Sequence, residues 1–234
     1  MDEQTYYAVR EALIAAHTAQ RPEFQRHYLE WVILNEDTAT TDFDAHYIYF
    51  VAWAVRKLAE NKPPLHVDFS SSLHFVTTAA AICETRFYDL RPAELFIEGL
   101  TCLKADLTAL DIETRSLDSV SCMHVLEHIG LGRYGDTPDA SGDLKAIDEL
   151  KRIVRPGGRL YVVAPSGKPC VVFNAHRIYP VESFDGYFAD QFDLEELYFI
   201  KGEPKTAPPL LNPSFAETLP YNMGCGCYMF RKRS

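Results

Sequence analysis

The residues best suited to chemistry lie together near the middle of the chain. His124, Glu127 and His128 directly follow a strand-like apolar run. Imidazole and carboxylate groups can act as acids, as bases or as metal ligands. In an open α/β sheet, reactive groups gather beyond the carboxyl ends of the strands. This placement favours an enzyme over a packing module.

The spacing His124-x-x-Glu127-His128 also matches an inverted zinc-protease motif. That motif needs both histidines on one long helix, with a third ligand on another. Here three glycines between positions 130 and 135 follow at once, and they disfavour a long helix. A protease is therefore not the expected function.

Three carboxylates and one imidazole follow four predicted strands, at the point where each strand ends. The strands are expected at 65–69, 85–88, 102–105 and 119–123, with a fifth at 159–163. The residues at or just past the first four ends are Asp68, Asp89, Asp106 and His124. Because the carboxyl ends of parallel strands meet at one edge of a sheet, these side chains are expected to line a common crevice.

Around these strands, short apolar runs alternate with helical stretches, the pattern of βαβ units and a mostly parallel sheet. Two late strands are expected at 194–200 and 226–230, with a proline-rich loop between them. They favour an antiparallel pair at the sheet edge. The predicted class is α/β, with the main domain over residues 63–234.

The first sixty residues are predicted to be helical. Apolar residues recur at helical spacing from Tyr7 to Ile14, and further helices are expected at 22–34 and 44–60. The third helix carries an aromatic stripe, which is typical of a core face. Residues 1–62 are therefore expected to form an N-terminal helical cap on the main domain.

Two segments resemble class I S-adenosylmethionine-dependent methyltransferases. One is Val125-Leu126-Glu127-His128 after its strand, and the other is the helix and Pro156-Gly157-Gly158 turn before the fifth strand. The resemblance extends from about residue 65 to 232 and implies a Rossmann-like methyltransferase sheet with S-adenosylmethionine as cofactor. More narrowly, the stretches 130–136 and 173–179 resemble a little-characterised branch that often occurs alongside carbohydrate-biosynthesis proteins.

The resemblance also implies which residues hold the cofactor. Asp68 falls at the first acidic motif, and Asp89 falls at the acid that binds the ribose. Asp106 and Leu107 fall near the adenine, and His124 falls beside the expected sulfonium. A carboxylate can accept two hydrogen bonds from a ribose diol and one from an exocyclic amine.

The chain departs from the family at the glycine-rich loop. Where the family has Gly-x-Gly-x-Gly, this chain has Ser70-Ser71-Ser72-Leu73-His74. A non-glycine residue held at positive φ costs on the order of 1–2 kcal/mol. Ser70 and Ser72 are expected to turn the chain and to hydrogen-bond the methionine portion of the cofactor. The alternative is a non-catalytic binding module that keeps the fold and has lost the cofactor.

Small-RNA 2′-O-methyltransferases resemble the same region in carrying a Glu-x-x-Glu-His segment and a later histidine that together hold a divalent metal. The matching positions here are His124, Glu127, His128 and His176. On one helical turn, residues at i, i+3 and i+4 share a face and can converge on one ion. An imidazole in place of a carboxylate shifts preference from Mg²⁺ towards Zn²⁺, Mn²⁺, Fe²⁺ or Ni²⁺. The alternative is local packing without a metal, because Leu-Glu-His is common here in metal-free members of the superfamily.

The other histidines and the cysteines are expected to be structural. His66 lies in a strand, and the histidines of the predicted cap are expected to have no catalytic role; these are His17, His27 and His46. The six cysteines include no Cys-x-x-Cys pair. The spacing in Cys225-Gly226-Cys227 is too short for a usual zinc knuckle, so this segment is expected to enter an edge strand.

Composition excludes several classes of partner. The net charge is −10, and the one dense basic block is the tail Arg231-Lys232-Arg233. Nucleic-acid binding usually needs a basic face, so a small-molecule substrate is expected instead. No run reaches the length of an apolar membrane span, and the first residues do not resemble a signal peptide. The chain is therefore expected to be cytoplasmic.

Together these patterns predict methyl transfer from S-adenosylmethionine to a hydroxyl of a sugar or sugar-containing metabolite, such as a nucleotide sugar. With a metal, the ion would lower the pKa of the hydroxyl; without one, His128 or His176 would be the base, beside Glu127. Arg133, Tyr134 and Asp136 extend from the same loop and are expected to hold the substrate, although Gly135-Asp136 also suits a simple turn.

Overall fold

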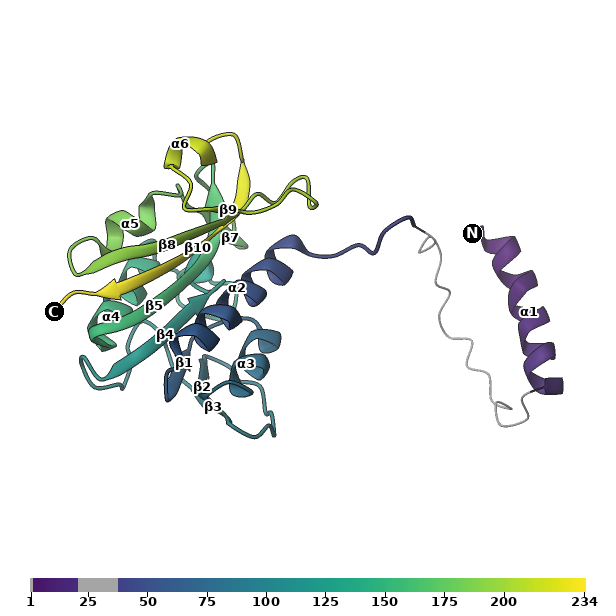
Figure 1. Cartoon of the computed structure of the whole chain (residues 1–234), viewed down its shortest axis with the longest axis horizontal. Helices are drawn as coiled ribbons and strands as arrows, with labels where there is room; N and C mark the ends of the chain where they lie inside the picture. The colour runs from purple at the N-terminus through teal and green to yellow at the C-terminus, as the bar shows by residue number, and fades with distance from the viewer. Residues whose placement is uncertain (1, 21–37) are drawn as a thin grey trace. The chain divides into compact units, whose positions relative to one another are not determined.

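The computed structural model describes residues 2–20 and 38–234, in two compact units, Met1–Phe43 and Asp44–Ser234 (Figure 1). The first unit contains α1 (Glu3–Gln20), which confirms the helix expected there. The expected helix at 22–34 lies outside the described residues. The third helix is confirmed as α2 (Ala45–Asn61), but it belongs to the second unit with the sheet. A cap formed by residues 1–62 stays a prediction.

An eight-stranded sheet lies at the centre of the second unit, in the order β3-β2-β1-β4-β5-β10-β8-β9. The parallel part consists of β1 (Leu65–Asp68), β2 (Glu84–Asp89), β3 (Leu100–Lys104), β4 (Leu117–Met123) and β5 (Val154–Gly167). The antiparallel part consists of β10 (Met223–Lys232), β8 (Phe192–Ile200) and the short β9 (Leu210–Leu211). The α/β class and the antiparallel strands at the sheet edge are therefore confirmed.

Helices cover both faces of this sheet, with α2 and α3 on one side and α4 and α5 on the other (Figure 1). Their bounds are α3 (Leu73–Ala80), α4 (Gly142–Ile153) and α5 (Ser183–Phe188). A single 3₁₀ turn, η1 (Leu126–His128), follows β4, and a hairpin of β6 (Cys170–Val172) and β7 (His176–Ile178) follows β5. A short α6 (Phe215–Thr218) precedes β10. Among the described residues, no helix is long and apolar enough to cross a lipid bilayer.

The helix α2 is fixed to the sheet by packing and by hydrogen bonds between partly buried side chains. Asp44 caps its first turn by accepting a hydrogen bond from the Tyr47 amide at 3.1 Å. Trp53 is buried, and its Nε1 donates to Glu196 Oε1 of β8 at 2.7 Å. Lys57 Nζ lies 2.9 Å from the other oxygen of the same carboxylate. These contacts hold the first turn of α2 beside the ends of β4 and β10.

Candidate active site

A cavity of about 690 Å³ lies at the carboxyl ends of β1 to β4. Its other wall is the loop between η1 and α4, with Lys145 from the first turns of that helix. The predicted site residues that line it are Asp89, Asp106, Leu107, His124, His128, Tyr134 and Asp136. The predicted site residues that do not line it are Asp68, Ser70, Ser72, Glu127, Arg133 and His176.

Two carboxylates stand at the edge of this cavity, held by their own turns. Asp89 Oδ1 accepts a hydrogen bond from the Arg91 amide at 2.6 Å. Asp106 Oδ1 accepts from the amide and the hydroxyl of Thr108, at 2.9 and 2.7 Å. Within the described part of the chain, Oδ2 of each carboxylate accepts no hydrogen bond. Each aspartate therefore keeps an oxygen with which it can bind a ligand.

Asp68 lies beneath the cavity wall, in a fully buried polar network. Its carboxylate accepts hydrogen bonds from the Ser121 hydroxyl and from the Ser70 amide, the latter at 3.0 Å. Ser121 Oγ and Ser119 Oγ lie 2.8 Å from the two ring nitrogens of His66. Burial raises the pKa of Asp68 to about 7 despite these bonds, and burial lowers the pKa of His66 to about 3. His66 is therefore structural, as expected.

The serine loop meets the cavity through its middle residue. Ser71 lines the cavity, whereas Ser70 and Ser72 are buried. Ser72 is the N-cap of α3, and its side chain accepts a hydrogen bond from the Phe75 amide at 3.3 Å. The capping bond explains why a serine starts this helix where the family has glycine. Direct contact of Asp68, Ser70 or Ser72 with a cofactor stays a prediction.

His124 ends β4 because its backbone turns into the left-handed region, with φ of 55°. Non-glycine residues rarely adopt this conformation, and such strain persists only where the surroundings impose it. The turn separates His124 from η1, which starts at Leu126. The expectation that His124, Glu127 and His128 share one helical turn is therefore wrong.

His128 faces the cavity in a defined orientation. Its Nδ1 lies 2.6 Å from the carbonyl oxygen of Ala175, which can only accept a hydrogen bond. The proton of a neutral His128 ring is therefore on Nδ1, and Nε2 keeps its lone pair. Glu127 Oε1 lies 3.9 Å from this Nε2. A ring held in this way can accept a proton at Nε2.

His176 lies on β7 beside this cluster. Burial lowers the pKa of His176. The charge of Glu127 raises this pKa and that of His128 lowers it, and the pKa is lowered overall. Among the described residues, however, the predicted set of His124, Glu127, His128 and His176 is not gathered into one compact ligand group. A metal shared by these four stays a prediction.

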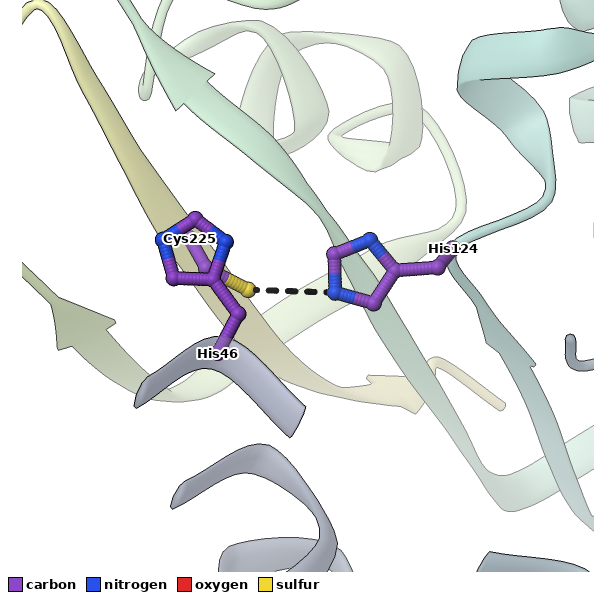
Figure 2. Close-up of side chains that lie close together, drawn as sticks. All are labelled: His46, His124 and Cys225. Carbon is purple, nitrogen blue, oxygen red and sulfur yellow. Dashed lines mark hydrogen bonds between the residues drawn. The ribbon is translucent and has the colours of Figure 1, made fainter. Parts of the chain in front are cut away.

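The compact ligand group that the described residues do form is His46, His124 and Cys225, whose ligand atoms all lie within 4.8 Å of one another (Figure 2). Cys225 Sγ lies 3.6 Å from His124 Nε2, and Glu127 Oε1 lies 2.9 Å from His124 Nδ1. Neither His46 nor Cys225 was expected to take part in ligand chemistry. No local sequence pattern marks this group, because the three residues come from α2, the end of β4 and β10.

Burial and neighbouring charges shift the pKa of His124 in opposite directions. Burial raises the pKa of the Cys225 thiol and lowers the pKa of His46. Burial alone would also lower the pKa of His124, but the Cys225 sulfur and the Glu127 carboxylate raise it overall. A tightly coupled group of this kind, beside a cavity, is typical of a functional site.

The loop between η1 and α4 is organised by Asp136. Its carboxylate accepts hydrogen bonds from the amides of Gly130, Gly132 and Tyr134, at 2.8, 3.1 and 3.1 Å. Partial burial alone would raise the pKa of Asp136, but these amides lower it overall. The Tyr134 ring meets the His128 ring edge-on at 5.6 Å, and the Arg133 guanidinium lies 5.1 Å from the Tyr134 ring centre. Contact of this loop with substrate stays a prediction.

Comparison with known protein families gives one partial match. Residues 74–184 match a family model described as "Caenorhabditis protein of unknown function, DUF268". This segment covers α3 to α5 and therefore most of the cavity. No curated protein sequence matches the chain.

Solved structures share the fold at low sequence identity. N-methyltransferase NodS from Bradyrhizobium japonicum WM9 has a TM-score of 0.57 at 12% identity, over 83% of this chain and 100% of that one. Geranyl diphosphate methyltransferase, solved in complex with SAM, has a TM-score of 0.53 at 12% identity, over 78% of this chain and 85% of that one. The [4+2]-cyclase SpnF has a TM-score of 0.53 at 13% identity, over 77% of this chain and 81% of that one. The chain therefore has the fold of class I S-adenosylmethionine-dependent methyltransferases, as the sequence resemblance implied.

Proposed function

We propose that this protein is an S-adenosylmethionine-dependent methyltransferase that acts on a hydroxyl of a sugar or sugar-containing small molecule. The observation that carries the proposal is the cavity at the carboxyl ends of β1 to β4, with Asp89 and Asp106 at the ends of adjacent strands. In doubly wound sheets, ligands bind at this edge. The likeness to methyltransferase structures supports the fold, and the cavity supports the chemistry.

The residues present fit the cofactor. Asp89 would hold the ribose hydroxyls, because one of its oxygens is available and hydroxyls are donors. Asp106 would accept from the adenine amine, and the apolar side chain of Leu107 would contact the ring. The cavity volume is in the usual range for a small-molecule site, roughly 300–1,000 Å³. S-adenosylmethionine, when bound, supplies an electrophilic methyl group on a sulfonium.

The chain's own task is then to position an acceptor hydroxyl and to remove its proton. His128 is the proposed base, since Nδ1 donates to Ala175 and Nε2 is free to accept the proton. Glu127 is buried, and its Oε1 lies 3.9 Å from this Nε2. The Ala175 carbonyl orients the ring through Nδ1, and this leaves Nε2 as the nitrogen that meets the acceptor hydroxyl.

The acceptor side of the cavity suits a polar molecule. Tyr134 lines the cavity there, and the guanidinium groups of Arg91 and Arg133 lie 4.8 and 5.1 Å from the centre of its ring. Asp139 and Lys145 form an ion pair at 2.7 Å on the same wall. An aromatic face beside charged hydrogen-bonding groups can bind both the C–H and the hydroxyl surfaces of a sugar. This mixture supports a sugar-containing substrate.

Calorimetry with S-adenosylmethionine and S-adenosylhomocysteine tests the proposal. We expect Asp89→Ala to weaken S-adenosylhomocysteine binding by about 1.5–3 kcal/mol, the usual value of a charged hydrogen bond, and Asp106→Ala to weaken it less. Transfer of a labelled methyl group to a panel of sugars and nucleotide sugars would then identify the acceptor. If neither compound binds the wild-type chain, the enzyme proposal fails, and a non-catalytic binding module remains.

A further inference from the structure

We propose that His46, His124 and Cys225 are the protein ligands of one zinc ion beside the cavity. This inference does not rest on methyl transfer. Three elements far apart in sequence bring the side chains together: the first turn of α2, the end of β4 and the interior of β10 (Figure 2). His124 and Cys225 are buried, and His46 is half-buried.

The spacing of the ligand atoms fits a tetrahedral zinc site. With zinc–sulfur distances of about 2.3 Å and zinc–nitrogen distances of about 2.0–2.1 Å, a sulfur and a nitrogen ligand lie about 3.5 Å apart. The distance from Cys225 Sγ to His124 Nε2 is 3.6 Å. All three ligand atoms lie within 4.8 Å of one another. The half-buried His46 therefore has to approach by at most about 1.5 Å to reach tetrahedral spacing.

The orientation of His124 is that of a metal ligand. Its Nδ1 lies 2.9 Å from Glu127 Oε1, so a neutral ring donates an Nδ1–H hydrogen bond to the carboxylate. The lone pair of Nε2 then points towards Cys225. In metal sites, histidine ligands commonly donate their second nitrogen to a carboxylate, which fixes the ring. The left-handed backbone of His124 is a further constraint imposed at this point of the chain.

The charges support the same ion. Glu127 is 1% exposed, and its Oε2 accepts no hydrogen bond from the residues that the structure describes. A buried carboxylate is costly unless positive charge or hydrogen-bond donors compensate it, and here His124 contacts Oε1 alone. A zinc ion bound to the Cys225 thiolate would leave one positive charge, and the Glu127 carboxylate would neutralise it.

The donor set favours zinc over magnesium. Two imidazoles and one thiolate suit borderline-soft ions, whereas magnesium prefers oxygen ligands. Three protein ligands leave the fourth tetrahedral position to water or to a substrate oxygen, as in catalytic zinc sites. Because His124 also lines the cavity, the ion would lie next to the space in which we expect the cofactor and the acceptor.

The test uses the full chain, purified without chelator or polyhistidine tag and loaded with zinc. We expect about one zinc per chain by mass spectrometry, and loss of most of it in His46→Gln and in Cys225→Ser. Cys227→Ser is the matched control, since this buried cysteine lies two residues along the same strand and outside the ligand group. Glu127→Gln should weaken zinc binding by about 10–100-fold.

Cobalt substitution gives an independent readout. The wild type and Cys227→Ser should show the visible bands of tetrahedral cobalt and a thiolate-to-cobalt charge-transfer band, and Cys225→Ser should lose the latter. If Cys225→Ser does not fold, His46→Gln decides, because His46 is only half-buried. The proposal is overturned if the wild type shows neither stoichiometric zinc nor the cobalt bands. It is also overturned if His176→Ala loses the metal while both ligand variants keep it.

Discussion

Replacing Asp68 by asparagine should change how stability depends on pH. The ordinary pKa of this carboxyl is 3.8, and burial raises it to about 7 in the folded chain. Between these pH values the folded chain keeps a proton at Asp68 that the unfolded chain has released. The free energy of unfolding therefore falls as pH rises across this window. At about 1.4 kcal/mol per pKa unit, the total is roughly 4 kcal/mol.

His66, linked to Asp68 through Ser121, has the opposite effect. Its ordinary pKa is 6.5, and burial lowers it to about 3. Between these values the unfolded chain holds the proton and the folded chain does not, so stability rises with pH. The two slopes cancel over their shared window in the wild type. Asp68→Asn removes the contribution of Asp68 to the pH dependence of the free energy of unfolding and leaves that of His66.

The measurement is urea unfolding of both proteins at pH values from about 4 to 8. The free energy of unfolding of Asp68→Asn, minus that of the wild type, should increase by about 1.4 kcal/mol per pH unit up to about pH 7 and then level off. Asp148→Asn, on the exposed side of α4, controls for the loss of one negative charge. A difference that does not change with pH would refute the assignment of a raised pKa to Asp68.

Three further substitutions test other parts of the structure. His128→Ala should lower the methyl-transfer rate by about 10²–10⁴-fold while S-adenosylhomocysteine still binds; an unchanged rate in labelled-methyl assays would exclude His128 as the base. Glu196→Ala should lower the free energy of unfolding by about 1–3 kcal/mol in urea titrations, because Trp53 and Lys57 both lose a half-buried partner. A change near zero would contradict this anchor of α2. Asp136→Ala should speed hydrogen exchange at the amides of Gly130, Gly132 and Tyr134, by an amount equivalent to about 1–3 kcal/mol. Unchanged exchange would show that the carboxylate does not hold the loop.

The sequence by itself determined the mostly parallel sheet, its antiparallel edge strands and the acids at the strand ends. Alternation of apolar runs with helical stretches is a local property, and parallel strands joined by helices have few ways to pack. Asp89 and Asp106 could therefore be assigned to the cavity edge before any coordinates, and both line it. The resemblance placed Pro156-Gly157-Gly158 before the expected strand at 159–163, whereas the observed β5 already begins at Val154 and includes these residues.

Tertiary structure alone decided which side chains face the cavity and which face each other. Ser71 lines the cavity instead of Ser70 or Ser72 because Ser72 is used to cap α3. His124 lies outside the helical turn of Glu127 and His128 because its backbone adopts a left-handed conformation at the end of β4. It meets His46 and Cys225 because α2 packs on the sheet and β10 lies beside β5. Such pairings depend on long-range packing, which local periodicity does not encode.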